Sequence, residues 1–457
     1  MPRATTTPPS SHRPARLPAV RMPYPDTGRG GAESREFRRL PVCPDLRPGE
    51  ALDGYLERAA AINGLTSSRL TAILKTILKM PPETLPSSVS GAVVDEGSAD
   101  LGVSAGARDL LNLMYRPAGR LVAAVAQLLD LEPVTVRQAT LLRYSQGSRP
   151  VLHRGDARAS GRLREIATAG WRPPLGTQFC PACLAAEPIW KLRWRLPMLA
   201  VCTVHGQYLV ARCPACGRVA RASSRQPLRP APWPDLTCGV YPRHGGGGPC
   251  QQPLTASHPC PAPCPAPCPA PRPAPRPAPR PAPCPAPCSA PGSGICAGAD
   301  EVLAARRIEA ACDGCAVTVL NRPTPAADYL VCLRQLAVLL LRLAHHRGAA
   351  SVAGWAEALQ PAPDGHRQPA ERWCFCTPGG AVTRAGALAA ADRILDAPDV
   401  AAAVDLLMPW AGLSLHRLST CCEAMLGDSR SPIITHVVSA LPRQAPATGV
   451  AAAGQLF

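Results

Sequence analysis

The sequence predicts a mostly α-helical protein whose β structure is confined to one cysteine-rich stretch. Apolar residues recur at the spacing of an amphipathic helix over about 51–62, 66–79 and 328–345. Between positions 180 and 216, pairs of Cys and His residues separated by two residues occur instead. Such pairs are typical of small zinc-ribbon elements, so the predicted fold class is mostly α with small zinc-ribbon β elements.

The charge balance favours a polyanionic partner. The 457 residues are enough for two or three domains, and 49 Lys and Arg against 32 Asp and Glu give a formal net charge of +17. No Lys-rich amphipathic helix or lipid motif accompanies this charge, so double-stranded DNA is a better partner than a membrane. The alternative is a basic composition that carries no function.

Cysteine usage indicates a reducing compartment. The chain has 21 cysteines, no signal peptide at its start and no apolar run of 18 residues. We therefore expect a cytoplasmic, nucleoid-associated protein without a membrane segment, in which thiols bind metal rather than form disulfides.

The first two helices are joined by a short turn. Asn63 and Gly64 end the helix predicted at 51–62, and Thr66 is expected to cap the helix that follows and runs to 79. Two helices connected in this way predict a helix-turn-helix-like unit that docks on DNA. A plain helical hairpin follows the same pattern and is the alternative.

Two ligand pairs predict a zinc site. Cys180 and Cys183 are separated by two residues, as are Cys202 and His205, and 18 residues lie between the pairs. Each pair can hold two corners of a tetrahedral zinc ion, and four protein ligands leave no open position, so the zinc would be structural. Free cysteines or a disulfide are the alternative. Strands are expected beside this site at 193–196 and 207–210.

The order of these motifs resembles the TniQ family of transposon target-selection proteins, which includes TnsD-type proteins. The resemblance covers most of 38–255. It rests on Pro48-Gly49-Glu50 with Tyr55-Leu56, on Phe179-Cys180-Pro-x-Cys183-Leu184, on Trp194-x-Leu196-Pro197, on Val201-Cys202-x-x-His205-Gly206 and on Cys213-Pro-x-Cys216-Gly217.

The resemblance implies a second zinc ion. Cys213 and Cys216 would supply two ligands, and Cys238 and Cys250 lie where the family's second pair would fall. Here 11 residues separate these two cysteines instead of the usual two, which leaves His244 as a rival for one corner.

A run of arginines between the two halves of this second site is the strongest local basic patch. Arg218, Arg221, Arg225 and Arg229 occur there without any acidic residue. We expect these four arginines to bind DNA phosphates beside the zinc-stabilised turn. A solvated loop is the alternative.

The chain divides into five predicted segments. These are a disordered Arg/Pro-rich tail (1–37), an N-terminal helical domain with the helix-turn-helix-like unit (38–177), a tandem zinc-binding module (178–255), a low-complexity linker (256–297) and a C-terminal helical domain (298–457). The linker repeats Pro-x-Pro-Ala, which favours polyproline II. Helices in the last segment are predicted at 301–311, 328–345, 382–396, 399–408, 412–425 and 433–441.

The sequence offers no recognisable catalytic set. It lacks a Gly-Lys-Ser/Thr phosphate loop, and it has no Asp/Glu triad of the kind that positions two metals for strand transfer. The protein is therefore not expected to be an enzyme. The resemblance implies an adaptor that selects a target for a transposase and its AAA+ ATPase regulator, either by binding DNA directly or by docking on an RNA-guided effector. The alternatives are a free-standing zinc-ribbon and helix-turn-helix transcription regulator, or a purely structural protein-interaction scaffold.

Overall fold

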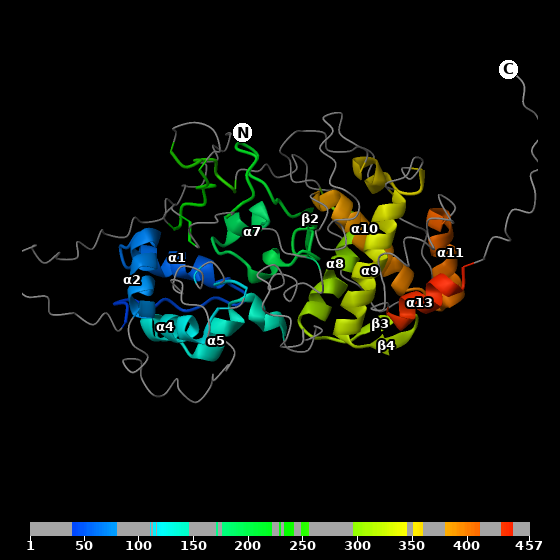
Figure 1. Cartoon of the computed structure of the whole chain (residues 1–457). Coiled ribbons are helices and arrows are strands. Elements are labelled where there is room, and N and C mark those ends of the chain that lie inside the picture. Colours follow the sequence, from blue (N-terminus) through cyan, green and yellow to red (C-terminus); the bar gives the residue numbers. More distant parts are fainter. Residues whose placement is uncertain are drawn as a thin grey trace, which may run out of the picture. The chain divides into compact units, whose positions relative to one another are not determined.

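Helices dominate the computed structural model of the chain, as the sequence predicts (Figure 1). The structure describes residues 39–79, 110, 113–115, 117–145, 171, 176–221, 228–229, 233–241, 248–255, 296–344, 351–359, 380–411 and 431–441. All of them belong to one compact unit, Arg38–Phe457. The predicted tail, most of the predicted linker and the predicted helix at 412–425 lie outside the described residues.

The N-terminal part begins with the two predicted helices, α1 (Leu52–Ile62) and α2 (Ser67–Lys79). Gly64, at a φ of +66°, forms the turn between them, and the Thr66 hydroxyl accepts a hydrogen bond from the Arg69 N–H at 3.1 Å. Three further helical segments follow, α4 (Gly119–Leu129), α5 (Pro133–Gln138) and the 3-10 helix η3 (Leu141–Ser145). Both the helices and the cap are confirmed, whereas DNA docking by α1 and α2 stays a prediction.

The cysteine-rich part has less β structure than predicted. It contains the helix α7 (Pro181–Ala186) and a two-stranded antiparallel hairpin of β1 (Val201–Cys202) and β2 (Gln207–Tyr208). The strand expected at 207–210 is confirmed in its first half. The strand expected at 193–196 is wrong, because Leu192–Arg195 form the 3-10 helix η5. This tight turn buries Trp194. Its ring packs edge-on against that of Trp190, with the two ring centroids 6.3 Å apart.

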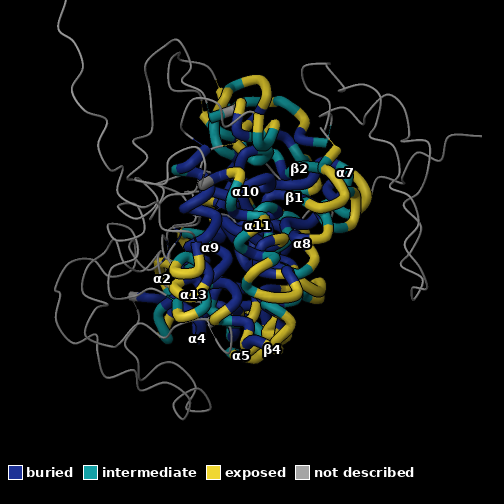
Figure 2. The backbone as a smooth tube through the Cα atoms, turned by 90° about the vertical axis from the view of Figure 1, so that its right-hand side faces the viewer, coloured by how far each residue is buried: buried dark blue, intermediate teal, exposed yellow. Residues whose placement is uncertain are grey.

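The C-terminal part is a helical assembly around α9 (Ala326–Ala344). Figure 2 shows α9 and α10 (Ala381–Leu395) in the dark blue of buried residues. Around them lie α8 (Ala299–Cys312), the hairpin of β3 (Val317–Val319) and β4 (Arg322–Thr324), the 3-10 helix η7 (Gly354–Leu359), α11 (Val400–Ala411) and α13 (Pro432–Ser439). None of the described helices combines the length and the apolar character needed to cross a membrane.

The C-terminal helices pack directly on the β1–β2 hairpin. The Ala297 N–H donates to the Gly206 carbonyl at 2.8 Å, and the hydroxyls of Thr203 and Tyr208 donate to carboxylates of α8. Ala200 and Val201 bury small apolar surfaces against Ala305 and Ala385. Both helices and cysteine-rich turns therefore contribute to one continuous packed region.

Gly386 offers a test of this packing. A methyl group at Gly386 would overlap the ring of Trp355, which is itself stacked on Trp410 at 5.2 Å. Alanine gains up to about 1 kcal/mol over glycine in a helix, but overpacking costs about 1–3 kcal/mol. We expect Gly386→Ala to lower the free energy of unfolding in urea denaturation. Gly354→Ala, where a methyl group meets no atom within 4 Å, is the control and should not.

Candidate metal centres and the buried charge network

The first predicted ligand set converges in space. Cys180 precedes the first turn of α7, Cys183 lies within that turn, Cys202 ends β1 and His205 lies in the turn before β2. The four ligand atoms all lie within 4.8 Å of one another. The three cysteines are buried and His205 is exposed.

The spacing of these atoms suits tetrahedral zinc. The His205 Nδ1 atom lies 3.2 Å from the Cys183 Sγ, 3.5 Å from the Cys180 Sγ and 3.6 Å from the Cys202 Sγ. The Cys183 and Cys202 sulfurs are 3.6 Å apart. Zinc bonds of about 2.3 Å to sulfur and 2.0 Å to nitrogen place tetrahedral ligand atoms about 3.5–3.8 Å apart. The donor set and its dimensions therefore fit this metal.

Hydrogen bonds within the cluster split the thiol pKa values in opposite directions. Those from Cys180 and Cys183 hold the pKa of Cys202 far below its usual range. Those with Cys180 and Cys202 raise the pKa of Cys183 far above it. The thiols thus share protons at the position where a cation would bind, and metal binding would release those protons.

The second predicted ligand set also converges. Cys213, Cys216, Cys238 and Cys250 place their sulfurs within 4.8 Å of one another, with Cys213 and Cys250 at 3.9 Å and Cys216 and Cys238 at 3.7 Å. Gly217, at a φ of +65°, completes the turn that presents the first pair, and its N–H donates to the Cys213 carbonyl. The rival ligand His244 lies outside the described residues.

Backbone pairing compensates for the long gap between Cys238 and Cys250. The Gly239 N–H donates to the Cys250 carbonyl at 2.9 Å, and the Cys250 N–H donates to the Val240 carbonyl at 3.0 Å. The Cys238 N–H donates to the Gln252 carbonyl at 2.8 Å. The two cysteines therefore lie on opposite strands of a short antiparallel ladder, Cys238 paired with Gln252 and Cys250 with Val240, although 11 residues separate them in the sequence.

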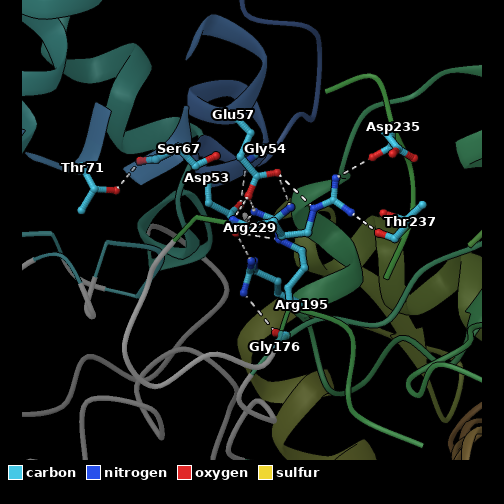
Figure 3. Close-up of polar contacts among 11 residues, drawn as sticks. Asp53, Gly54, Glu57, Ser67, Thr71, Gly176, Arg195, Arg229, Asp235 and Thr237 are labelled. Carbon is cyan, nitrogen blue, oxygen red and sulfur yellow. Dashed lines mark hydrogen bonds and ion pairs between the residues drawn. The ribbon is translucent and has the colours of Figure 1, made fainter. Parts of the chain in front are cut away.

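Two carboxylates of α1 lie at the centre of a buried charge network. The side chains of Asp53 and Glu57 are each 2% exposed. Figure 3 shows them directed toward arginines that come from the cysteine-rich part. Arg221 donates from Nε to the Asp53 carboxylate at 3.0 Å and from both terminal nitrogens to Glu57 at 2.8 and 2.7 Å. Arg195 pairs with Asp53 from the other side.

Arg229 extends this network toward the second cysteine cluster. Its backbone N–H donates to Glu57 at 2.6 Å, and its guanidinium donates to the carbonyls of Thr237 at 2.6 Å and Asp235 at 3.3 Å. Three guanidinium groups therefore face two carboxylates. The ring of Trp190 lies 4.7 Å from the Arg221 guanidinium and 5.1 Å from that of Arg229, where its π face helps to stabilise the excess positive charge.

The network keeps Asp53 ionised despite burial. Burial alone would raise the pKa of Asp53, but the charges of Arg195 and Arg221 hold it below its usual value. The charges of Asp53 and Glu57 raise the pKa of Arg221. Asp53 and Arg221 are therefore charged at neutral pH, and each depends on its partners to remain buried.

These positions bear on the predicted DNA contacts. The side chains of Arg221 and Arg229 are 2% and 4% exposed and are engaged inside the protein, which argues against phosphate contacts by either. Arg218 is half-buried, and Arg225 lies outside the described residues. The sequence analysis missed Asp53 and Glu57. The sequence pattern that could have indicated their role is a pair of acids four residues apart on α1, among the apolar residues of its buried face.

The sequence model of the TniQ family matches residues 41–209. These residues therefore form a TniQ domain, which confirms the resemblance inferred from the sequence. The TniQ domain spans both carboxylates of α1 and all four ligands of the first cluster, and it ends before Cys213. The second cluster therefore lies beyond the matched residues. A search of curated proteins finds no match.

The charge network makes Arg221 a stability determinant. We expect Arg221→Met to cost about 3–5 kcal/mol, because Asp53 and Glu57 would remain buried with too few partners. Arg218→Met removes the same charge from a half-buried position and should change stability by less than about 0.5 kcal/mol. Urea denaturation of both variants measures the difference. Equal midpoints for the two variants would contradict the role given to Arg221.

Proposed function

We propose that this chain is a non-enzymatic adaptor that helps to select the insertion site for a transposase and its AAA+ ATPase regulator. The TniQ domain over residues 41–209 is the observation that carries this proposal. Such an adaptor acts in the cytoplasm, on the DNA, and reaches its target by binding duplex DNA or by docking on an RNA-guided effector.

We propose Zn²⁺ as the metal of both clusters. Cys180, Cys183, Cys202 and His205 would hold the first ion, and the four cysteines of the second set would hold the other. In each set all four corners come from the protein, so the ion would cross-link the chain and would leave no open position for a substrate. The metals would therefore stabilise the surface that recognises the target.

For DNA contact we propose the outward face of α2 together with Arg218 and Arg225. Arg69 and Lys75 are exposed on α2, and no acidic residue occurs between Ser67 and Lys79. Two further exposed residues, Ala72 between these cations and Thr76 next to Lys75, are small enough to let the helix approach a DNA groove. Arg69 and Lys75 are therefore exposed on a helix that has no acidic residue to neutralise them. Arg221, by contrast, is buried and paired with two carboxylates.

The zinc proposal is tested on its first cluster. We expect Cys202→Ala to lose about one zinc ion per chain by elemental analysis and to lose the folded cysteine-rich region, because the remaining three ligands hold the metal weakly. Cys315→Ala, at an exposed cysteine outside both clusters, is the control. A folded Cys202→Ala protein with its full zinc content would refute the assignment.

The DNA proposal is tested by fluorescence anisotropy of a labelled duplex at several salt concentrations. We expect Arg69→Gln and Lys75→Gln each to weaken binding and to lower the slope of log affinity against log salt by about 1. Arg306→Gln removes an exposed charge from α8 and serves as the control. Unchanged binding in both α2 variants would exclude this face. No binding by the unmodified chain at moderate salt would direct the search to protein partners.

A further inference from the structure

The segment that carries the second cysteine cluster also supplies most of the positive charge that α1 requires. Arg221 follows Cys216 by five residues, and Arg229 donates to the carbonyl of Thr237, the residue before Cys238. Glu57 contacts Arg221 and Arg229 and, among the described residues, forms ion pairs with no other side chain. Each half of the cluster is therefore linked to the same carboxylate of α1.

Those two halves are separate pieces of backbone. One is a hairpin in which the Cys213 N–H donates to the Arg218 carbonyl and the Ala220 N–H donates to the Ala211 carbonyl. The other is the ladder in which Cys238 pairs with Gln252. Within the described part of the chain, no backbone hydrogen bond joins the hairpin to the ladder. The cysteine sulfurs, at 3.7 and 3.9 Å, are the contact across which a metal ion would join them.

We propose that the metal ion of the second cluster fixes the position of α1, with Arg221 and Arg229 as the positioning residues. This inference rests on the proposed metal. When the ion is present, it holds the hairpin and the ladder together, and their arginines neutralise Glu57. When it is absent, the two halves separate and Glu57 becomes a buried carboxylate with no cation, a strongly unfavourable state. Helix α1 then opens so that water can solvate Glu57.

The coupling works in both directions. If the metal stabilises the contact between Glu57 and the two arginines, the contact must stabilise the bound metal by the same free energy. Residues that orient metal-binding segments typically change metal affinity about 10–100-fold when they are altered. Since α1 leads through Gly64 into α2, occupancy of the second cluster also controls the position of α2, whose outward face we propose for DNA contact.

The first experiment measures zinc release from the full chain to a chromophoric chelator. We expect two zinc ions per chain, and in Glu57→Gln we expect one of them to be released about tenfold faster while the other is unchanged. The matched control is Glu187→Gln, which removes an acid whose ion pair with Lys191 is partly exposed. Two ions with unchanged release in folded Glu57→Gln overturn the inference but leave the zinc proposal intact. A single ion in the unmodified chain that is retained in Cys250→Ser refutes both the second metal and this inference.

The second experiment keeps α1 unaltered and so does not depend on the folding of Glu57→Gln. Cys250→Ser removes a half-buried ligand of the second cluster, and Cys315→Ser is the control at an exposed cysteine. We expect hydrogen exchange of peptides within α1 to become at least tenfold faster in Cys250→Ser than in the control. Peptides of α9 should be unaffected. A Cys250→Ser chain that has lost one zinc ion and keeps full protection in α1 overturns the inference.

Discussion

Burying a carboxylate inside a protein is unfavourable unless a cation is held against it, and α1 buries two. The cations for Asp53 and Glu57 come from three positions that follow α1 by more than 130 residues, at Arg195, Arg221 and Arg229. The N-terminal helices are therefore correctly placed only when the cysteine-rich turns have formed. This dependence joins the N-terminal helical segment and the cysteine-rich segment, which were predicted from the sequence as separate parts of the chain.

The cysteine-rich region has few regular elements with which to hold those arginines. Its strands are two residues long, and its turns depend on glycines at positive φ such as Gly206 and Gly217. Two four-ligand clusters compensate for this shortage, because each would cross-link segments that share little backbone pairing. The clusters and the charge network thus stabilise the same part of the protein by different means.

Features with short-range causes could be predicted from the sequence. The bounds of α1 and α2 follow from apolar spacing, a Gly turn and a Thr cap. The convergence of eight Cys and His residues into two clusters follows from paired spacing and the family resemblance. The 3-10 helix at Leu192–Arg195 could not be predicted, because it accompanies the burial of Trp194 in the core, which the local sequence pattern does not reveal. The burial of Arg221 could not be predicted either, because its partners Asp53 and Glu57 are distant in the sequence. An arginine-rich run looks identical whether it faces DNA or two distant carboxylates.

The cysteine-rich region anchors the chain on both sides of the repeat-rich stretch 256–295. On one side of the stretch, the Leu254 N–H donates to the Leu236 carbonyl, and on the other side the Ala297 N–H donates to the Gly206 carbonyl. Neither hydrogen bond involves a residue of the stretch itself. A change in the number of Pro-x-Pro-Ala units would therefore leave both anchoring hydrogen bonds in place.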